Sequence, residues 1–161
     1  MLAALPPGVA QYLQRHHVMT LASQGPDGPW GAAVFYVNDG TGLVFLSSPG
    51  SRHARNLALD SRCAATIQED CSDWTQIKGV QLEGQVTPLQ GDELASGQRL
   101  YGRKFPLVGS RGKLPVAIAA ALQRVRWYRL EPQRLYFIDN SRGFGHRDEI
   151  EPAPDELLGR A

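Results

Sequence analysis

The chain has 161 residues, 42% of them hydrophobic and 20% charged, with 17 Lys and Arg against 16 Asp and Glu. That size and composition are typical of one globular domain, and the formal net charge of +1 excludes a general attraction to nucleic acid or to a membrane surface. Without a run of ~20 apolar residues or a basic, apolar leader, the sequence predicts a single cytoplasmic domain over residues 1–161 that has neither nucleic acid nor membrane as a partner.

The first third of the chain predicts a short helix followed by three antiparallel strands. Apolar residues three and four apart indicate a helix over 9–16. A strand at 18–23 follows, and segments rich in Gly, Pro and Asp separate it from two runs that are apolar on both faces, 30–37 and 43–47. Short turns between successive strands are typical of an antiparallel meander.

The middle of the chain alternates between helix and strand. Ser51 precedes apolar residues at helical spacing and is a candidate N-cap for a short helix. A β-type run at 63–68 is followed by a polar loop at 69–73. Apolar and polar side chains alternate over 80–86, which predicts a strand with one face in water.

The last third begins with helices and a loop. A helix is expected to start near Asp92 and to stop at Pro106, because proline cannot continue a helix. Residues 108–115 are basic and contain glycine, which predicts a loop. The Ala-rich residues 116–122 are expected to form one or two helical turns.

The remaining residues complete the expected sheet. Strands are expected at 124–130 and 135–138, on either side of a turn at 131–133, and the tail from about residue 151 is expected to be weakly ordered. About six strands, mostly adjacent in sequence, predict a mainly β (α+β) fold. The expected architecture is a closed six-stranded antiparallel barrel with flanking helices.

The segment after the strand at 43–47 has the most chemical information. Ser47 and Ser48 are followed by a Pro-Gly turn and by a helix that opens with Ser51, Arg52 and His53. Free N–H groups and the positive end of a helix dipole attract anions, and arginine can bind phosphate through two hydrogen bonds. A capped surface helix could have the same residues. Basic side chains in a first turn oppose the dipole, however, and a bound anion would relieve that conflict.

At this segment the chain resembles the flavin-binding split barrels of the pyridoxamine 5′-phosphate oxidase-like superfamily. Those proteins have a strand that ends in small hydroxyl residues, then Ser-Arg-Lys at the start of a helix, then a strand of small and β-branched residues. The matching segments here are 45–48, 51–53 and 63–67, and a strand at 78–84 that ends in Glu-Gly continues the likeness. The family pattern therefore appears in the order in which the elements are expected.

Two further segments, 103–106 and 135–145, are similar more specifically to the YhbP-type subgroup of uncharacterised bacterial split-barrel proteins. The resemblance implies a six-stranded split barrel that binds flavin mononucleotide (FMN) at the subunit interface of a homodimer. It implies three groups of cofactor-binding residues: Ser47, Ser48, Ser51, Arg52 and His53 at the phosphate and ribityl chain; the main chain of Ala33, Val34 and Phe35 along the ring; and Lys78, from the second subunit, with Phe144 closing the site.

Departures from the family pattern bear on the substrate. The oxidases that give the superfamily its name have Arg and Lys where this chain has Gly31 and Tyr36, Gln where it has Gly79, and Lys where it has His53. Fewer cations weaken the support for a phosphorylated substrate, so oxidation of pyridoxamine 5′-phosphate is not expected. The expected function is an FMN-dependent oxidoreductase with an unknown small-molecule substrate and unknown catalytic residues.

Two other classes of function stay open. The chain could be a non-catalytic flavin or haem protein, with His53 as a candidate haem ligand, or a deazaflavin-dependent reductase. No metal site is expected, because zinc needs three or four convergent ligands and His16 and His17 would project from opposite faces of a strand. Cys63 and Cys71 are expected to be free thiols.

Overall fold

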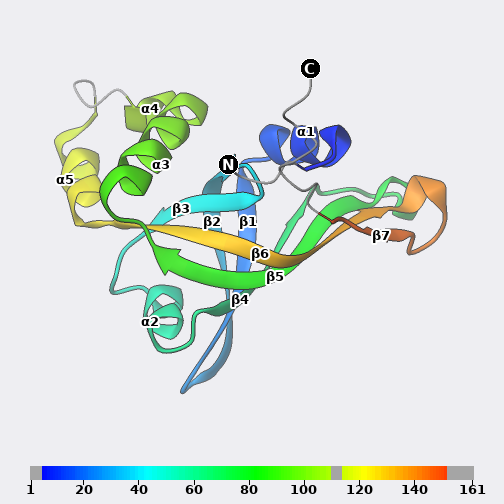
Figure 1. Cartoon of the computed structure of the whole chain (residues 1–161), viewed down its shortest axis with the longest axis horizontal. Coiled ribbons are helices and arrows are strands. Elements are labelled where there is room, and N and C mark those ends of the chain that lie inside the picture. Colours follow the sequence, from blue (N-terminus) through cyan, green and yellow to red (C-terminus); the bar gives the residue numbers. More distant parts are fainter. Residues whose placement is uncertain (1–4, 110–113, 152–161) are drawn as a thin grey trace.

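Six of seven antiparallel strands close into a barrel in the computed structural model, which describes residues 5–109 and 114–151 (Figure 1). The strands are β1 (Val18–Gly25), β2 (Gly28–Asp39), β3 (Gly42–Ser47), β4 (Arg62–Gln68), β5 (Lys78–Pro88), β6 (Arg126–Asp139) and β7 (Arg147–Glu149). Their order in the sheet is β3-β2-β1-β4-β5-β6-β7, and pairing of β3 with β6 closes the barrel. The predicted six-stranded split barrel is confirmed, with β7 as an additional strand at its edge.

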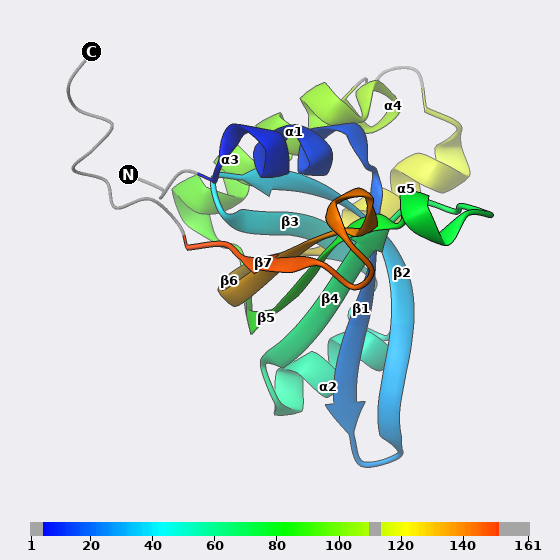
Figure 2. The ribbon, with the colours of Figure 1, turned by 90° about the vertical axis from the view of Figure 1, so that its right-hand side faces the viewer.

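Helices cover the two ends and one side of this barrel. They are α1 (Pro7–Arg15), α2 (Arg52–Leu59), α3 (Gly91–Lys104), α4 (Pro106–Gly109) and α5 (Val116–Arg124), with short 3-10 turns η1 (Trp74–Gln76) and η2 (Asn140–Arg142). Helices α1 and α2 lie at opposite ends of the barrel, and α3, α4 and α5 form a group beside β3 (Figures 1 and 2). Among the described residues, no helix has the length and apolarity that crossing a membrane requires.

The period of two along the strands separates the core from an outer face. Met19, Leu21 and Ser23 of β1 are buried, whereas Val18 and the other residues between them are exposed. The main core fills the barrel, and a second apolar cluster lies between the barrel and α3. The strand expected to have one wet face, β5, has the predicted alternation of buried and exposed residues.

An arginine fixes the turn that connects β2 with β3. Arg129 of β6 donates from Nη1 to the Asp39 carboxylate at 2.7 Å and from Nε to the Glu131 carboxylate at 2.8 Å. Gly42 packs directly against this guanidinium, because a Cβ atom at that position would lie 2.4 Å from the Arg129 side chain. The ion pairs therefore hold the hairpin against the strand that closes the barrel.

Two predictions about the last third of the chain were wrong. No turn interrupts the chain at 131–133, since β6 is continuous and is irregular only where it passes Gly84 of β5. A Cβ atom at Gly84 would lie 2.0 Å from the Glu131 carbonyl oxygen, so glycine permits the close approach that keeps both strands paired. The expected loop at 108–115 begins later, because Val108 belongs to α4. The rest of that loop at 110–113, and the tail from 152, lie outside the described residues.

Candidate functional site

The start of α2 follows directly after β3 and is capped by serine side chains. The Ser51 hydroxyl donates to the Ser48 carbonyl oxygen at 2.8 Å and accepts the Ala54 N–H at 3.3 Å. Ser51 is therefore the N-cap that its position in the sequence predicted. The Gly50 N–H donates to the Ser48 hydroxyl at 3.3 Å, so the protein's own hydrogen bonds fix the turn that leads into the helix.

Three polar side chains converge beside this cap. The Nε2 atom of His53 lies 2.5 Å from the Ser47 hydroxyl oxygen and 3.2 Å from that of Ser51, and the two hydroxyl oxygens are 3.2 Å apart. Burial lowers the pKa of His53, so its imidazole is neutral near pH 7. A neutral imidazole accepts a hydrogen bond from the Ser47 hydroxyl at Nε2 when its proton is on Nδ1, and donates to that hydroxyl when its proton is on Nε2. The structure thus brings together three of the predicted phosphate-binding residues.

Arg52 has a hydrogen-bond donor that no residue in the described part of the chain accepts. Its guanidinium carbon lies 4.5 Å from the centre of the Trp30 ring, and its Nη2 atom donates to the Asp27 carbonyl oxygen at 2.9 Å. Its Nε atom is buried and has no hydrogen-bond partner among the described residues. Nearly all buried polar groups in proteins have a hydrogen-bond partner. A buried polar group without one commonly marks the binding place of a ligand or an ion. An oxygen of an anionic ligand is the kind of acceptor that would satisfy this N–H.

Other cations surround the helix start. The first turn of α2 contains no acidic residue, and Arg55 donates from Nη1 to the Gly50 carbonyl oxygen. Ser47 pairs directly with Arg126 of β6, so both side chains project from the same face of the sheet. Sequence reasoning missed Arg126. Its alternation with Trp127 and Tyr128 indicated a strand, but local patterns do not reveal which distant strand is its neighbour.

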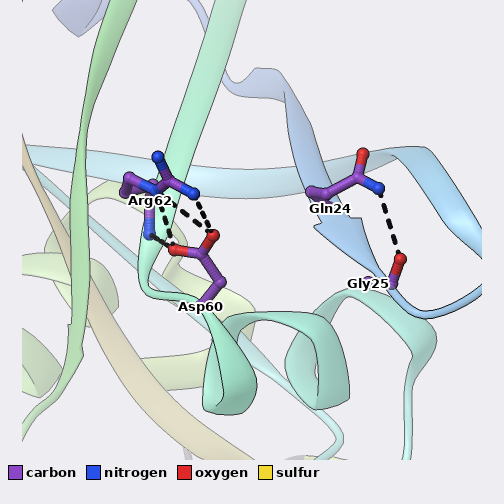
Figure 3. Close-up of polar contacts among 4 residues, drawn as sticks. All are labelled: Gln24, Gly25, Asp60 and Arg62. Atoms are coloured by element: carbon purple, nitrogen blue, oxygen red, sulfur yellow. Dashed lines mark hydrogen bonds and ion pairs between the residues drawn. The ribbon is translucent and has the colours of Figure 1, made fainter.

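Negative charge lies at the other end of α2. Arg62 donates to both carboxylate oxygens of Asp60 at 2.7–3.1 Å (Figure 3). These hydrogen bonds lower the pKa of Asp60 to about 2. The same view includes the tip of β1, where the Gln24 amide donates to the Gly25 carbonyl oxygen at 3.3 Å (Figure 3). An ion pair therefore compensates the carboxylate that follows α2, and the helix start keeps its positive potential.

The predicted ring-binding segment lies where β2 is paired on one edge only. Ala33, Val34 and Phe35 pair with β1, whereas β3 begins to pair with β2 at Tyr36. The Tyr36 N–H points to the β1 side of β2, where it donates to the His17 carbonyl oxygen at 3.0 Å. Because the backbone groups of successive strand residues face alternate edges, those of Ala33 and Phe35 face the edge that lacks a strand partner among the described residues. The backbone groups of Val34 face β1.

Lys78 and Phe144 are far from this site within one chain. Lys78 pairs with Asp139 and Ser47 pairs with Arg126, at the two ends of β6 (Figure 1). The 14 residues of β6 correspond to about 45 Å along the strand. The Lys78 ammonium lies 3.4 Å from an Asp139 carboxylate oxygen. A single chain therefore does not bring these two predicted residues to the start of α2.

Phe144, the residue predicted to close the site, is highly exposed to solvent. Its side chain is 83% exposed and makes an edge contact with Trp74, itself 57% exposed, at a centroid distance of 5.4 Å. Gly143 and Gly145 on either side both have positive φ angles, 143° and 70°. The two glycines let the chain turn sharply and present the aromatic ring to solvent.

The histidines near the amino terminus do not form a metal site. The His16 ring contacts the Tyr12 carbonyl oxygen and the Glu69 carboxylate, each at 2.7 Å, whereas the His17 ring packs against Phe105. Among the residues that the structure describes, no group of three His, Cys, Asp or Glu could hold a metal ion. Burial raises the pKa of the Cys63 thiol to about 11, which makes this residue chemically inert.

The closed barrel, the capped helix at its mouth and the half-paired β2 define a protein of the split-barrel class. A family model described as pyridoxamine 5′-phosphate oxidase matches residues 5–139. This chain therefore belongs to the pyridoxamine 5′-phosphate oxidase family, as the sequence motifs predicted.

Comparisons with individual proteins agree with that assignment. The UPF0306 protein of Enterobacter sp. (strain 638) is 31% identical over 141 residues, which cover 86% of this chain and 91% of the relative. The UPF0306 protein YhbP of Escherichia coli O157:H7 is 28% identical, with coverages of 86% and 88%. The predicted likeness to the YhbP-type subgroup is thus confirmed. The solved structure of a haem-binding protein from Mycobacterium smegmatis is similar with a TM-score of 0.68 and 25% identity, and the match covers 89% of this chain but 58% of the mycobacterial chain.

Proposed function

We propose that this protein binds flavin mononucleotide, with the phosphate at the start of α2 and the ring along the half-paired edge of β2. The observation that carries the proposal is the buried Nε atom of Arg52, which has no hydrogen-bond partner among the described residues. A phosphate oxygen would supply the missing acceptor beside a helix whose first turn contains no acidic residue. The bound flavin would supply hydride or electron transfer to a small-molecule substrate.

The residues of the site divide between the two ends of such a ligand. Arg52 would donate from Nε to the phosphate. The Ser47 hydroxyl would turn from His53, and the Ser51 hydroxyl from the Ser48 carbonyl oxygen, towards the phosphate oxygens. Backbone N–H groups in the first turn of α2 would add further donors. Arg126 would contribute positive charge from the strand opposite Ser47. At the other end, free backbone groups of Ala33 and Phe35 would bind the polar edge of the ring.

We further propose that the functional unit is a homodimer. The outer face of β1, β2 and β4 has small or apolar side chains in register, Val18 with Phe35 and Ala22 with Ala64. Val18 is 42% exposed and Phe35 55% exposed. An exposed sheet face with small and apolar side chains in register is suited to packing against a second copy across a two-fold axis. Such a dimer would also explain why Lys78 and Phe144 lie far from α2, because each would reach the site of the other subunit.

The geometry supports a substrate other than pyridoxamine 5′-phosphate. The Tyr36 side chain is fully buried and donates to the Leu13 carbonyl oxygen at 2.8 Å, so it does not face a substrate. Gly79 has no room for a side chain, since a Cβ atom there would lie 2.8 Å from the Ile67 carbonyl oxygen. The basic and amide groups that the named oxidases use are therefore not replaced at these positions. A substrate without a phosphate group is consistent with this site.

The likeness to a haem-binding protein supports haem as the alternative ligand. Haem ligation by His53 would require its Nε2 atom to leave the Ser47 hydroxyl at 2.5 Å. The unused donor of Arg52 would stay unsatisfied unless a haem propionate reached it. Haem therefore stays the alternative ligand, and titration with haemin separates it from FMN.

Titration of the purified protein with FMN tests the proposal. Flavin fluorescence should be quenched to saturation at one FMN per chain, and riboflavin should bind more weakly because it lacks the phosphate. Parallel titrations with haemin and with a 5-deazaflavin cofactor separate the alternatives. A Soret band that forms at one haem per chain, together with no quenching by FMN, would overturn the proposal.

A further inference from the structure

A hollow lies outside the barrel, between α3, α5 and the start of β6. Its volume is about 1130 Å³, which is slightly above the range of about 300–1,000 Å³ typical of ligand pockets. Trp127 of β6 lines it, whereas the preceding residue, Arg126, projects from the other face of the strand beside Ser47. The hollow is therefore separate from the proposed cofactor site.

Helix α5 has apolar surface that the chain itself does not bury. Its sequence, VAIAAALQR, is apolar at seven of nine positions, and no residue of this helix is buried. Ala119 and Leu122 line the hollow, with Leu94 of α3 among the residues that enclose it. A nine-residue helix has little stability of its own in water and normally depends on burial of its apolar face. An apolar occupant of the hollow would supply that burial.

The ionisable side chains that line the hollow are all basic. Arg99 and Arg103 lie one turn apart on α3, and neither has an ion-pair partner among the described residues. From Leu94 to Arg103 the helix advances about 14 Å. The lining therefore combines two cations on α3 with apolar residues on both sides of them along the chain, such as Leu94 and Pro106.

We propose that this hollow binds a linear alkyl carboxylate, such as a fatty acid. The carboxylate would contact Arg99 and Arg103, because guanidinium groups bind carboxylates through planar, paired hydrogen bonds. The alkyl chain would extend between α3 and α5 towards Leu94 and Trp127. No acidic residue is among the described residues of the lining, which favours an anion over a neutral or cationic ligand of the same shape.

Calorimetric titration of the full chain with decanoate and with 1-decanol tests this proposal, because the two probes share a chain length and differ in charge. Decanoate should bind saturably at one per chain and at least about tenfold more tightly than the alcohol. The double variant Arg99→Gln/Arg103→Gln should lose this difference. Arg124→Gln, at the end of α5 and outside the lining, is the matched control and should bind decanoate like the unmodified protein.

A variant whose larger side chain fills the hollow distinguishes a site for a small ligand from an interface with a second copy of the chain. Leu122→Trp should block both probes while FMN binding and the oligomeric state stay unchanged. Absence of saturable decanoate binding, equal affinity for the alcohol, or full binding by the double variant would each overturn the proposal. A change in oligomeric state caused by Leu122→Trp would overturn it too, since a second copy of the chain would then be the occupant. The FMN titration is independent of every one of these outcomes.

Discussion

Replacing Arg52 with methionine should weaken FMN binding by about tenfold to a hundredfold. The buried Nε atom, which has no partner within residues 5–109 and 114–151, would form a charged hydrogen bond with the phosphate, and such bonds contribute about 1.5–3 kcal/mol. Since about 1.4 kcal/mol corresponds to a factor of ten in affinity, this range gives the stated loss. Riboflavin lacks the phosphate, so its affinity should change by less than about twofold. Methionine retains an apolar stem above Trp30, which limits the loss of packing.

Fluorescence titration of both flavins with both proteins measures this effect as a double difference. Arg62→Met is the matched control, because Arg62 is bound to Asp60 at the other end of α2 (Figure 3). Urea denaturation of each variant checks that the fold is retained, with an expected loss of about 1 kcal/mol from the Arg52 hydrogen bond to Asp27. An equal loss for FMN and riboflavin, or no loss for either, would refute the assignment of Arg52 to the phosphate.

Three further predictions concern pH, assembly and stability. FMN affinity should rise as the pH falls towards the ordinary histidine pKa of about 6.5. Burial lowers the pKa of His53 in the free protein and an adjacent phosphate raises it, so that binding takes up a proton. A pH series of titrations in which wild type and His53→Gln behave alike would contradict this. Ala64→Arg should produce a monomer in sedimentation velocity and weaken FMN binding in titration. A dimer that persists would exclude the outer sheet face as the dimer interface. Ala121→Arg, at an exposed position of α5, is the control. Gly42→Ala should lower the free energy of unfolding in urea by about 2–4 kcal/mol, since the new Cβ atom would lie 2.4 Å from the Arg129 side chain. Gly8→Ala, where a Cβ atom would have no other atom within 4 Å, is the control. Equal effects of the two substitutions would argue against a stabilising role for the Arg129 ion pairs at this turn.

The local sequence pattern correctly predicted features that depend on a single strand or helix. The alternation over 80–86 predicted the wet face of β5, because the period of two depends only on that strand. Ser51 was identified as the N-cap from its place before a helical pattern, and its hydroxyl does accept the Ala54 N–H. The family motif then placed Ser47, Ser51 and His53 in one cluster, which the structure brings together.

Pairing between distant segments explains what the sequence could not predict. Pro132 indicated a turn, but Gly84 on the neighbouring strand permits the close approach that keeps β6 continuous. Arg126 was overlooked because its position opposite Ser47 depends on how the barrel closes. The three-residue β7 lacks enough residues for a periodic signal. In the first two cases the deciding contact joins residues far apart in the chain, and in the third the strand is too short to show a pattern.

The most direct measurement of the central claim is a crystal structure of the protein grown with FMN. A phosphate oxygen should lie within hydrogen-bond distance of the Arg52 Nε atom, with the Ser51 hydroxyl and the His53 ring beside it. A flavin whose phosphate lies away from the start of α2, with Arg52 Nε still unpaired, would contradict the account.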